Sequence, residues 1–333
     1  MRIYLPNKLI MIKANDVIIA YSTNRDTRHR ATSGGVGSAV IQYLFKKNII
    51  NSSISFTFNS EELRYEPQII YSQEEYSISG SIYHEINLIN FIKSNIHAIK
   101  SPIALFALPC QVAPIKNTLH KNGIESFIIE LTCSSQQSYE ATEYLLKHSN
   151  IKKSDVAHIQ YRGNGWPGGV RITLKDGREH FFHNNSSVWT KIFHSHLFIQ
   201  PRCFLCSNNK PRTADLVIAD PWSIDTYSAP AEGRTLCVVN SDKMAMTLNR
   251  MEEENLVQYE TGDSSLYTKS QYGTIVRKDY NQRHKKVIKA VKNIIQGERY
   301  KKNILSSKIL FNAHCSIYRI VFKILHKIFK IHL

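Results

Sequence analysis

The amino-acid sequence predicts a mixed α/β (α+β) protein built around one central sheet. Apolar stretches of strand length alternate with stretches of helical periodicity through the first half of the chain. Loops that are rich in glycine or carry a cysteine follow several of these strands, where open α/β sheets hold their ligands. A β-hairpin inserted near the middle and an amphipathic helix at the C-terminus complete the expected architecture.

The expected elements follow one another without an internal repeat or a low-complexity linker. We expect strands at 10–21, 49–58, 67–71, 103–108, 127–131, 156–162, 170–174, 179–182, within 201–222, and at 236–240. We expect helices at 40–45, 86–96, 112–119, 139–146, 244–256 and 280–295. The predicted organisation is a cofactor-binding core at 1–255, a helical extension at 256–300 and a basic helix at 301–333.

The composition is that of a globular protein with an anionic partner. The chain has 333 residues, 42% of them hydrophobic, and a formal net charge of +16. Nucleotide phosphate and acidic lipid suit this charge, whereas no nucleic-acid-binding module is recognisable, so we expect no nucleic acid. No apolar run reaches about eighteen residues, and Pro6, Asn7 and Lys8 interrupt the N-terminal segment. We therefore expect a cytoplasmic protein.

Six cysteines without a secretory signal indicate metal-binding or catalytic thiols. Cys203 and Cys206 form a Cys-x-x-Cys pair, while Cys110 and Cys133 each follow a predicted buried strand. Cys237 lies within a predicted core strand, and Cys315 lies in the C-terminal helix. The remaining four thiols have the number and softness that zinc and a 4Fe-4S cluster both require, and their spacing does not choose between the two.

A glycine-rich loop, Ser33-Gly34-Gly35, lies between a basic segment and a predicted helix. Backbone N–H groups at such a helix start can bind a phosphate or pyrophosphate, and Arg30 just upstream would assist. The alternative is that Ser33 only caps the helix while the glycines form a tight turn. Both interpretations remain open on local evidence.

The C-terminal segment is basic and amphipathic. It has no acidic residue from Tyr300 onward. Its predicted apolar face consists of Ile317, Ile320, Val321, Ile324, Leu325, Ile328 and Ile331. Such a helix can lie on an anionic membrane surface, or it can dock on the protein body or on a second subunit.

These motifs, in this order, resemble the beta subunit of coenzyme F-420 (deazaflavin) hydrogenase and dehydrogenase, a family that includes proteins of bacterial polysaccharide clusters. The likeness runs from about Arg30 to Trp222. The similar motifs are Arg30 with Ser33-Gly34-Gly35, Gly80-Ser81-Ile82-Tyr83, Ala107-Leu108-Pro109-Cys110-Gln111, Cys133, Cys203-x-x-Cys206, Ala214-Asp215 and Asp220-Pro221-Trp222.

The resemblance implies an FAD- and 4Fe-4S-dependent oxidoreductase that passes electrons between cluster, flavin and a small-molecule substrate. Cys110, Cys133, Cys203 and Cys206 would hold the cluster, which only the family favours over zinc. The residues implied in cofactor binding are Arg30, Ser33, Gly34, Gly35, Gly80, Ser81, Tyr83 and Asp220. No catalytic residue is assigned, because Tyr83, Arg162 and Asp220 are candidates by position alone.

The implied partners are a small-molecule substrate and an electron source. The family's N-terminal ferredoxin module is absent, so electrons would come from a separate carrier protein, a reduced coenzyme or the substrate itself. A sugar or lipid-linked glycan precursor is the preferred substrate, and the C-terminal helix would place the protein at the inner face of the membrane.

Three departures from the family's pattern concern the expected cofactor pocket. Ile82 replaces a lysine, Ala107-Leu108 replaces Gly-Thr, and Ala219 replaces a glycine. They weigh against use of the deazaflavin coenzyme. They also leave an alternative: a non-catalytic relative with a structural four-cysteine zinc site, acting as a partner in a glycan-assembly complex.

Overall fold

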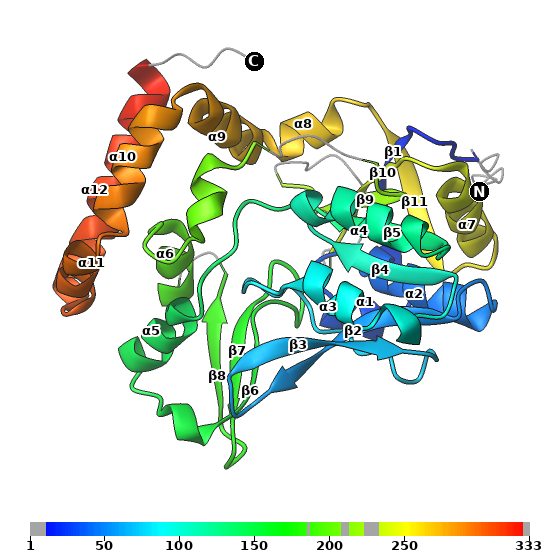
Figure 1. Cartoon of the computed structure of the whole chain (residues 1–333), viewed down its shortest axis with the longest axis horizontal. Helices are drawn as coiled ribbons and strands as arrows, with labels where there is room; N and C mark the ends of the chain where they lie inside the picture. Colours follow the sequence, from blue (N-terminus) through cyan, green and yellow to red (C-terminus); the bar gives the residue numbers. More distant parts are fainter. Residues whose placement is uncertain (1–10, 185–186, 208–212, 223–232, 329–333) are drawn as a thin grey trace, which may run out of the picture.

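A computed structural model describes residues 11–184, 187–207, 213–222 and 233–328, with the backbone alone from 322 onward. In these parts of the chain an eight-stranded mixed sheet forms the centre of the molecule, in the order β11-β1-β10-β9-β5-β4-β2-β3 (Figure 1). Its strands are β1 Val17–Ser22, β2 Ser52–Asn59, β3 Arg64–Ile70, β4 Ile103–Ala107, β5 Ser126–Leu131, β9 Leu216–Ala219, β10 Thr235–Val239 and β11 Val257–Gly262. The predicted fold class is confirmed.

The strand directions place several loops at one edge of the large sheet. β2, β4, β5 and β9 are parallel neighbours, whereas β1, β3, β10 and β11 pair antiparallel. The carboxyl ends of β4, β5 and β9 therefore open on the same edge. The segments that leave there contain Cys110, Cys133 and Asp220. This edge is where sheets of this kind bind ligands.

Helices cover both faces of the large sheet (Figure 1). Alternation along β4 explains why, since Ala104 packs with α2 and α7, while Ile103 and Leu105 pack with α3 and α4. The bounds are α2 Val36–Lys46, α3 Leu88–Ser94, α4 Pro109–Lys121 and α7 Asp242–Glu253. A short helix, α1 Arg25–Arg30, leads from β1 toward α2.

A second, antiparallel sheet contains the predicted hairpin. It has the order β6-β7-β8, with β6 Val156–Gln160, β7 Gly169–Leu174 and β8 Glu179–His183. Gly177 has a φ of 85° in the turn between β7 and β8, as the Asp-Gly signal requires. Val170 and Ile172 of β7 pack with Trp189 in a core shared with α5 Glu140–His148 and α6 Val188–His194.

The chain after β11 forms five helices in its described part, three of which make one end of the molecule (Figure 1). They are α8 Leu266–Ser270, α9 Tyr272–Arg283, α10 Lys285–Ile295, α11 Glu298–Leu305 and α12 Lys308–Ile328. A single helix was expected at 280–295, but the structure has two that meet at His284. No helix in the described ranges is long and apolar enough to cross a membrane.

α12 is anchored by a face other than the predicted apolar one. Phe311 is buried with its ring centroid 4.8 Å from that of Tyr144, and His314 Nε2 lies 2.9 Å from the Ser195 carbonyl oxygen. Ile317 and Ile320, members of the predicted apolar face, are exposed. The helix thus docks on the protein body and still presents an apolar surface. Members of that face from Ile324 onward lie outside the described side chains.

Candidate functional site

A cavity of about 1620 Å³ lies along the carboxyl edge of the large sheet. It exceeds the range of roughly 300–1,000 Å³ that is typical of sites for one small ligand. Its wall extends from the loop before α2, past the ends of β4, β5 and β9, to α6, α9 and α12. One cavity therefore connects the predicted cofactor loops with the C-terminal helices.

The glycine-rich loop contributes to the cavity wall and also packs on the sheet. Ser33 and Gly35 line the cavity, and Gly35 begins α2 with a φ of 76°. Gly34 faces the sheet instead: its N–H donates to Thr235 Oγ1 at 2.9 Å, and a Cβ there would lie 2.7 Å from the Ala20 carbonyl oxygen. The tight-turn interpretation accounts for Gly34, and Ser33 does not cap α2, because Gly35 is the N-cap and the Ser33 hydroxyl lies 3.0 Å from Thr235 Oγ1.

The structure does not bring Arg30 to the described wall of the cavity. Its guanidinium is half exposed and lies 3.5 Å from the Asp26 carboxylate, one turn earlier in α1. Exposed pairs of this kind contribute little to stability. The arginine that reaches the cavity beside the glycine-rich loop is Arg162, on the loop that follows β6.

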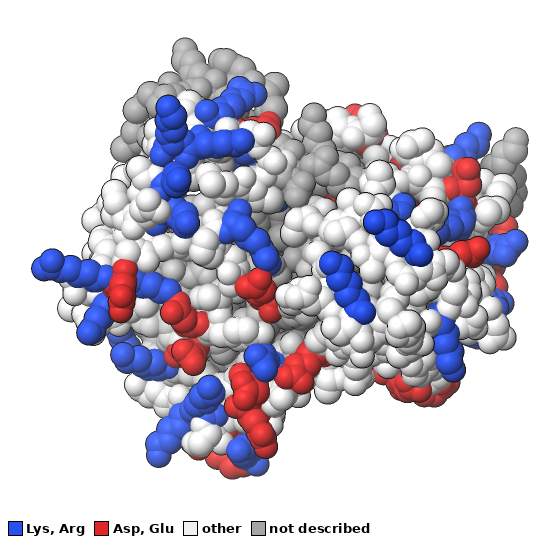
Figure 2. All heavy atoms as spheres, in the orientation of Figure 1, with Lys and Arg blue, Asp and Glu red and all other residues white. Residues whose placement is uncertain are grey.

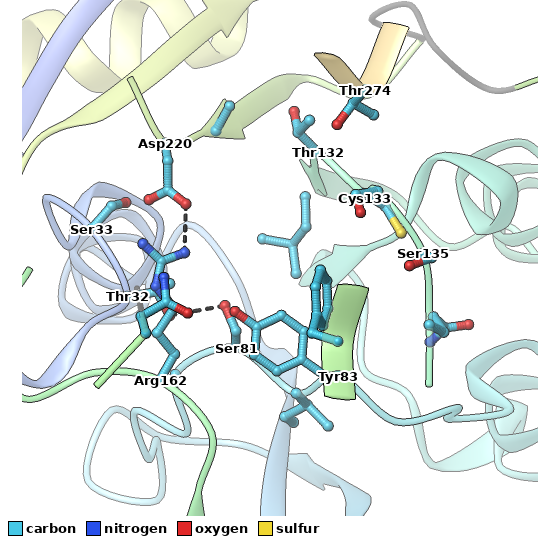
Figure 3. A pocket seen from close by; sticks show the side chains of 18 of the residues that line it. Thr32, Ser33, Ser81, Tyr83, Thr132, Cys133, Ser135, Arg162, Asp220 and Thr274 are labelled. Carbon is cyan, nitrogen blue, oxygen red and sulfur yellow. Dashed lines mark hydrogen bonds and ion pairs between the residues drawn. The ribbon is translucent and has the colours of Figure 1, made fainter. Parts of the chain in front are cut away.

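Arg162 and Asp220 form a buried ion pair in the cavity wall (Figure 3). Arg162 Nη1 lies 2.5 Å from Asp220 Oδ2, and Arg162 Nε donates to the Pro167 carbonyl oxygen at 3.0 Å. Burial opposes the charge of the guanidinium, but Asp220 outweighs this effect and raises the pKa of Arg162. For the neighbouring Tyr83, burial raises the pKa, so its hydroxyl stays protonated at neutral pH. The site thus has a fixed cation and a neutral phenol.

Gly80 allows this arrangement because no side chain fits at its position. Its φ is 70°, and a Cβ there would lie 2.0 Å from the Arg162 carbonyl oxygen. Ser81 and Tyr83 follow on the same cavity wall, and the Ser81 hydroxyl donates to Thr32 Oγ1 at 3.1 Å (Figure 3). The predicted cofactor-binding residues other than Arg30 and Gly34 therefore line one cavity.

The four predicted cluster cysteines come from three places in the chain. Cys110 lies in the first turn of α4, Cys133 follows β5, and Cys203 and Cys206 lie in and just after the 3-10 helix η3 Pro201–Leu205. All six cysteines of the chain are free thiols. Of the four predicted cluster cysteines, only Cys133 belongs to the cavity wall.

The thiols are close enough to influence one another's charge. Burial raises the pKa of Cys110, and negative charge on Cys206 and Cys203 raises it further. Burial raises the pKa of Cys133 to about 12, and negative charge on Cys203, Cys110 and Cys206 contributes to this increase. As placed, however, the described residues contain no group of three or more His, Cys, Asp or Glu side chains that could hold a metal ion.

Helix α9, which sequence analysis did not connect with the site, fastens the loops that carry these cysteines. Arg277 Nη2 donates to the Ser134 carbonyl oxygen and Lys278 Nζ to that of Cys133, each at 2.6 Å. Asn281 Nδ2 donates to the Phe204 carbonyl oxygen at 2.8 Å. The sequence offers little signal for this role, because a lysine that becomes fully buried in a helix looks like any surface lysine.

The surroundings of the thiols suit a negatively charged group. Burial raises the pKa of Cys110 and of Cys133, and positive charge from Arg202 and from Lys278, respectively, offsets part of that increase. Burial lowers the pKa of Arg277, while charge on Cys133, Cys203 and Cys206 opposes that change. Three cations therefore surround four thiols from separate loops. In number and softness these donors match a cluster held by four thiolates, whose charge the cations would offset, although the side chains as placed do not form a closed ligand set.

The three family departures also lie in the cavity wall. Ile82, Ala107 and Ala219 all line it, and Ile82 packs against the core beneath the small sheet. The positive charge of a lysine is therefore missing beside Tyr83. Ala107 and Ala219 end β4 and β9, where each adds a methyl group to the cavity edge.

Comparison with known proteins gives one consistent family. A model described as "Coenzyme F420 hydrogenase/dehydrogenase, beta subunit N-term" matches residues 17–93, and its counterpart for the C terminus matches residues 101–265. A chain from a xenon-derivatized F420-reducing [NiFe] hydrogenase complex of Methanosarcina barkeri has a similar fold, with a TM-score of 0.59 and 15% identity. The similarity covers 81% of this chain and 91% of that one. A search of curated proteins found no match.

Proposed function

Because the chain belongs to the coenzyme F420 hydrogenase/dehydrogenase beta-subunit family, we propose that it is an FAD- and 4Fe-4S-dependent oxidoreductase. It passes electrons between the cluster, the flavin and a small-molecule substrate. The observation that carries the proposal is that four thiols from three segments lie near enough to influence one another's pKa, with Cys133 in the wall of a large cavity and three cations nearby. A redox role is common to the family, and the two cofactors are our proposal for this chain.

The cluster ligands in this proposal are Cys110, Cys133, Cys203 and Cys206. When bound, a 4Fe-4S cluster transfers single electrons, at a potential that depends on nearby charge and hydrogen bonding. The protein contributes cations next to the thiolates and fixes the Cys133 loop through Lys278. Because the bound thiols must lose their protons, these cations also favour the binding of iron.

Exchange of each cysteine tests the ligand set. We expect Cys110→Ser, Cys133→Ser, Cys203→Ser and Cys206→Ser each to lower the iron and sulfide content after anaerobic purification. Cys315→Ser is the control, since that thiol lies 3.8 Å from the Lys191 carbonyl oxygen and none of the other cysteines influences its pKa. A variant among the four that keeps full iron and sulfide would remove that residue from the set. If the unaltered protein held one zinc per chain and all four variants lost it, the alternative of a structural zinc site would be established.

The flavin in this proposal occupies the part of the cavity between the glycine-rich loop and Cys133. Gly35 opens α2, whose first N–H groups can receive a pyrophosphate. The Arg162 guanidinium, which is paired with Asp220, adds hydrogen-bond donors beside Ser81 and Tyr83. The volume of the cavity accommodates a dinucleotide with space for a second molecule. These features support FAD rather than a smaller flavin.

Flavin specificity can be measured by quenching of tryptophan fluorescence. Trp189 and Trp222 line the cavity, and the ring centroids of Trp166 and Trp222 are 5.4 Å apart. We expect FAD to quench this emission with higher affinity than FMN or riboflavin, because only FAD carries a pyrophosphate for the glycine-rich loop. Equal affinity for FAD and riboflavin would exclude a role for that loop in binding.

The substrate that we propose is a sugar or lipid-linked glycan precursor of polysaccharide biosynthesis. Support comes from the inclusion of polysaccharide-cluster proteins in the family and from the basic C-terminal helices. Apolar residues replace the family's lysine and glycines at the cavity wall, which weighs against the deazaflavin coenzyme. Electrons would then arrive from a carrier protein, a reduced coenzyme or the substrate.

The C-terminal helices support a peripheral position on an anionic membrane. Ile309, Ile317 and Ile320 of α12 are 80%, 61% and 56% exposed, on a face opposite the buried Phe311. Figure 2 shows Lys and Arg side chains gathered over the end of the molecule that α10 and α12 form. An exposed apolar stripe with basic flanks is typical of helices that lie at a membrane interface.

Vesicle flotation tests this position. We expect the protein to float with vesicles of phosphatidylglycerol and phosphatidylcholine at low salt, and less with phosphatidylcholine alone. Replacing Ile317 and Ile320 with serine should weaken flotation. Met246→Ser is the matched control, because Met246 is 54% exposed on α7, far from α12 in Figure 1. Equal flotation of both variants would exclude α12 as the contact.

A further inference from the structure

The cavity continues past the cysteines to a mouth formed by α6, α9 and α12. Lys191 of α6, Arg277 of α9 and Arg319 of α12 contribute positive charge to its wall, and Asn312 contributes an amide. The matched family segments end at residue 265, so α9 and α12 lie beyond them. The mouth is thus built largely by a part of this chain that the family description does not cover. We call Lys191, Arg277, Arg319 and Asn312 the cationic mouth.

The charges along the cavity are strongly unequal. Among the described wall residues, five are Lys or Arg and one is acidic, a difference of +4. Two of the five cations have carboxylate partners: Arg162 pairs with Asp220, and Lys269 lies 3.6 Å from Asp263. For the three cations of the cationic mouth, no ion pair with a described carboxylate is found. The excess positive charge is therefore concentrated at this end of the cavity.

Contacts within the cationic mouth hold its donors in place. Lys191 Nζ donates to Asn312 Oδ1 at 2.8 Å, which joins α6 to α12. This contact leaves the amide nitrogen of Asn312 and further protons of the ammonium group for a ligand. Arg277 uses one terminal nitrogen for the Ser134 carbonyl oxygen, so its guanidinium has donors to spare. Burial, together with positive charge from Arg277, lowers the pKa of His194, so that histidine is neutral at pH 7 and adds no charge to the mouth.

We propose that the cationic mouth binds a phosphate or diphosphate group of the substrate. Two guanidinium groups and one ammonium group from three helices suit an anion with several oxygens better than a single carboxylate. The group would be held at the opening while the rest of the substrate extends inward toward Cys133. This inference rests on the proposed function for the role of the bound molecule, but not for the binding itself.

Calorimetric titration with inorganic pyrophosphate tests the site in the full-length protein as purified. We expect Arg319→Gln and Lys191→Gln each to weaken pyrophosphate binding about tenfold, the usual scale for one charge-assisted hydrogen bond. Lys302→Gln is the matched control, since Lys302 is exposed on α11 and does not line the cavity. Acetate should bind far more weakly than pyrophosphate to the unaltered protein.

Each result has a defined meaning. Absent pyrophosphate binding, or equal affinity in all three variants, would overturn the proposal, and the second result would place the anion elsewhere, as at the glycine-rich loop. If Arg319→Gln weakened binding and Lys191→Gln did not, Arg277→Gln would be measured next. Weaker binding in Arg277→Gln would support the site, and unchanged binding would overturn it.

A second titration with geranyl diphosphate distinguishes two sources of the same chemistry. Tighter binding of geranyl diphosphate than of pyrophosphate indicates a lipid-linked substrate, and equal binding indicates a water-soluble phosphate. In either case Arg319→Gln must weaken the binding. Iron, sulfide and flavin are measured on the same sample. A protein without cofactors that still binds pyrophosphate through Arg319 would refute the proposed function and retain this inference.

Discussion

Single residues at the site are constrained by backbone contacts that a sequence does not display. Gly80 is the clearest case, because its φ of 70° and its approach to the Arg162 carbonyl oxygen both exclude a side chain. The Gly80-Ser81-Ile82-Tyr83 motif indicated a functional turn, but Arg162, whose backbone lies against Gly80, is on another loop 82 positions later. A short motif can therefore locate a site without revealing its neighbours.

Exchange of Gly80 should show this contact directly. Gly80→Ala should lower the free energy of unfolding more than Gly177→Ala does, in urea denaturation. Both glycines have positive φ, which costs an alanine about 1–2 kcal/mol. Nothing lies within 4 Å of a Cβ at Gly177, whereas one at Gly80 would meet the Arg162 carbonyl oxygen at 2.0 Å. Equal losses would mean that Arg162 does not constrain position 80.

His84 should make stability depend on pH. It is buried, shares hydrogen bonds with Tyr161 and Thr142, and stacks on Tyr139, and burial lowers its pKa to about 3. The unfolded chain, with a histidine pKa near 6.5, therefore takes up this proton first as the pH falls. Stability should decrease by about 1.4 kcal/mol per pH unit from roughly pH 6.5 toward 3.

The share of this effect that belongs to His84 can be isolated by comparison with His84→Gln. Other buried histidines, such as His196, also have a lowered pKa, so both proteins should lose stability in acid. The unaltered protein should lose more between pH 6.5 and 4.5. Parallel stability curves over that range would contradict a buried neutral His84.

At the scale of elements, the alternating core was predictable, and the segments that complete the site were not. β4 and β5 follow from continuous apolar runs, and their shared edge follows from parallel pairing. β11 and α9 show no clear apolar pattern, because β11 is mostly exposed and the buried positions of α9 include Lys278 and Asn281. The four cysteines of the proposed cluster site stood out because thiols are rare, while Arg162 and Lys278 are of a common type.

Helix α9 should control how firmly the cysteine loops hold their metal. Lys278→Met removes the donor to the Cys133 carbonyl oxygen and a cation that lowers the pKa of Cys133. We expect a lower iron content and faster loss of iron to a chelator than in the unaltered protein. Lys286→Met, at an exposed position of α10, should behave like the unaltered protein. Identical iron loss in both variants would contradict the role of α9.

At the scale of the whole molecule, a family core and a C-terminal addition share one cavity. The matched segments end at residue 265, yet the cavity wall includes α9 and α12. The sequence located both ends of this cavity, through the glycine-rich loop and the basic helix, without indicating that they meet. Their meeting depends on packing between distant segments, such as that of Phe311 against Tyr144, which no local pattern encodes.

The central claim is that the four thiols hold an iron-sulfur cluster beside a flavin. Its most direct test is the visible spectrum of the anaerobically purified protein, with iron, sulfide, zinc and released flavin measured on the same sample. We expect flavin bands and about four iron and four sulfide per chain. A colourless protein that holds one zinc and no flavin would contradict it.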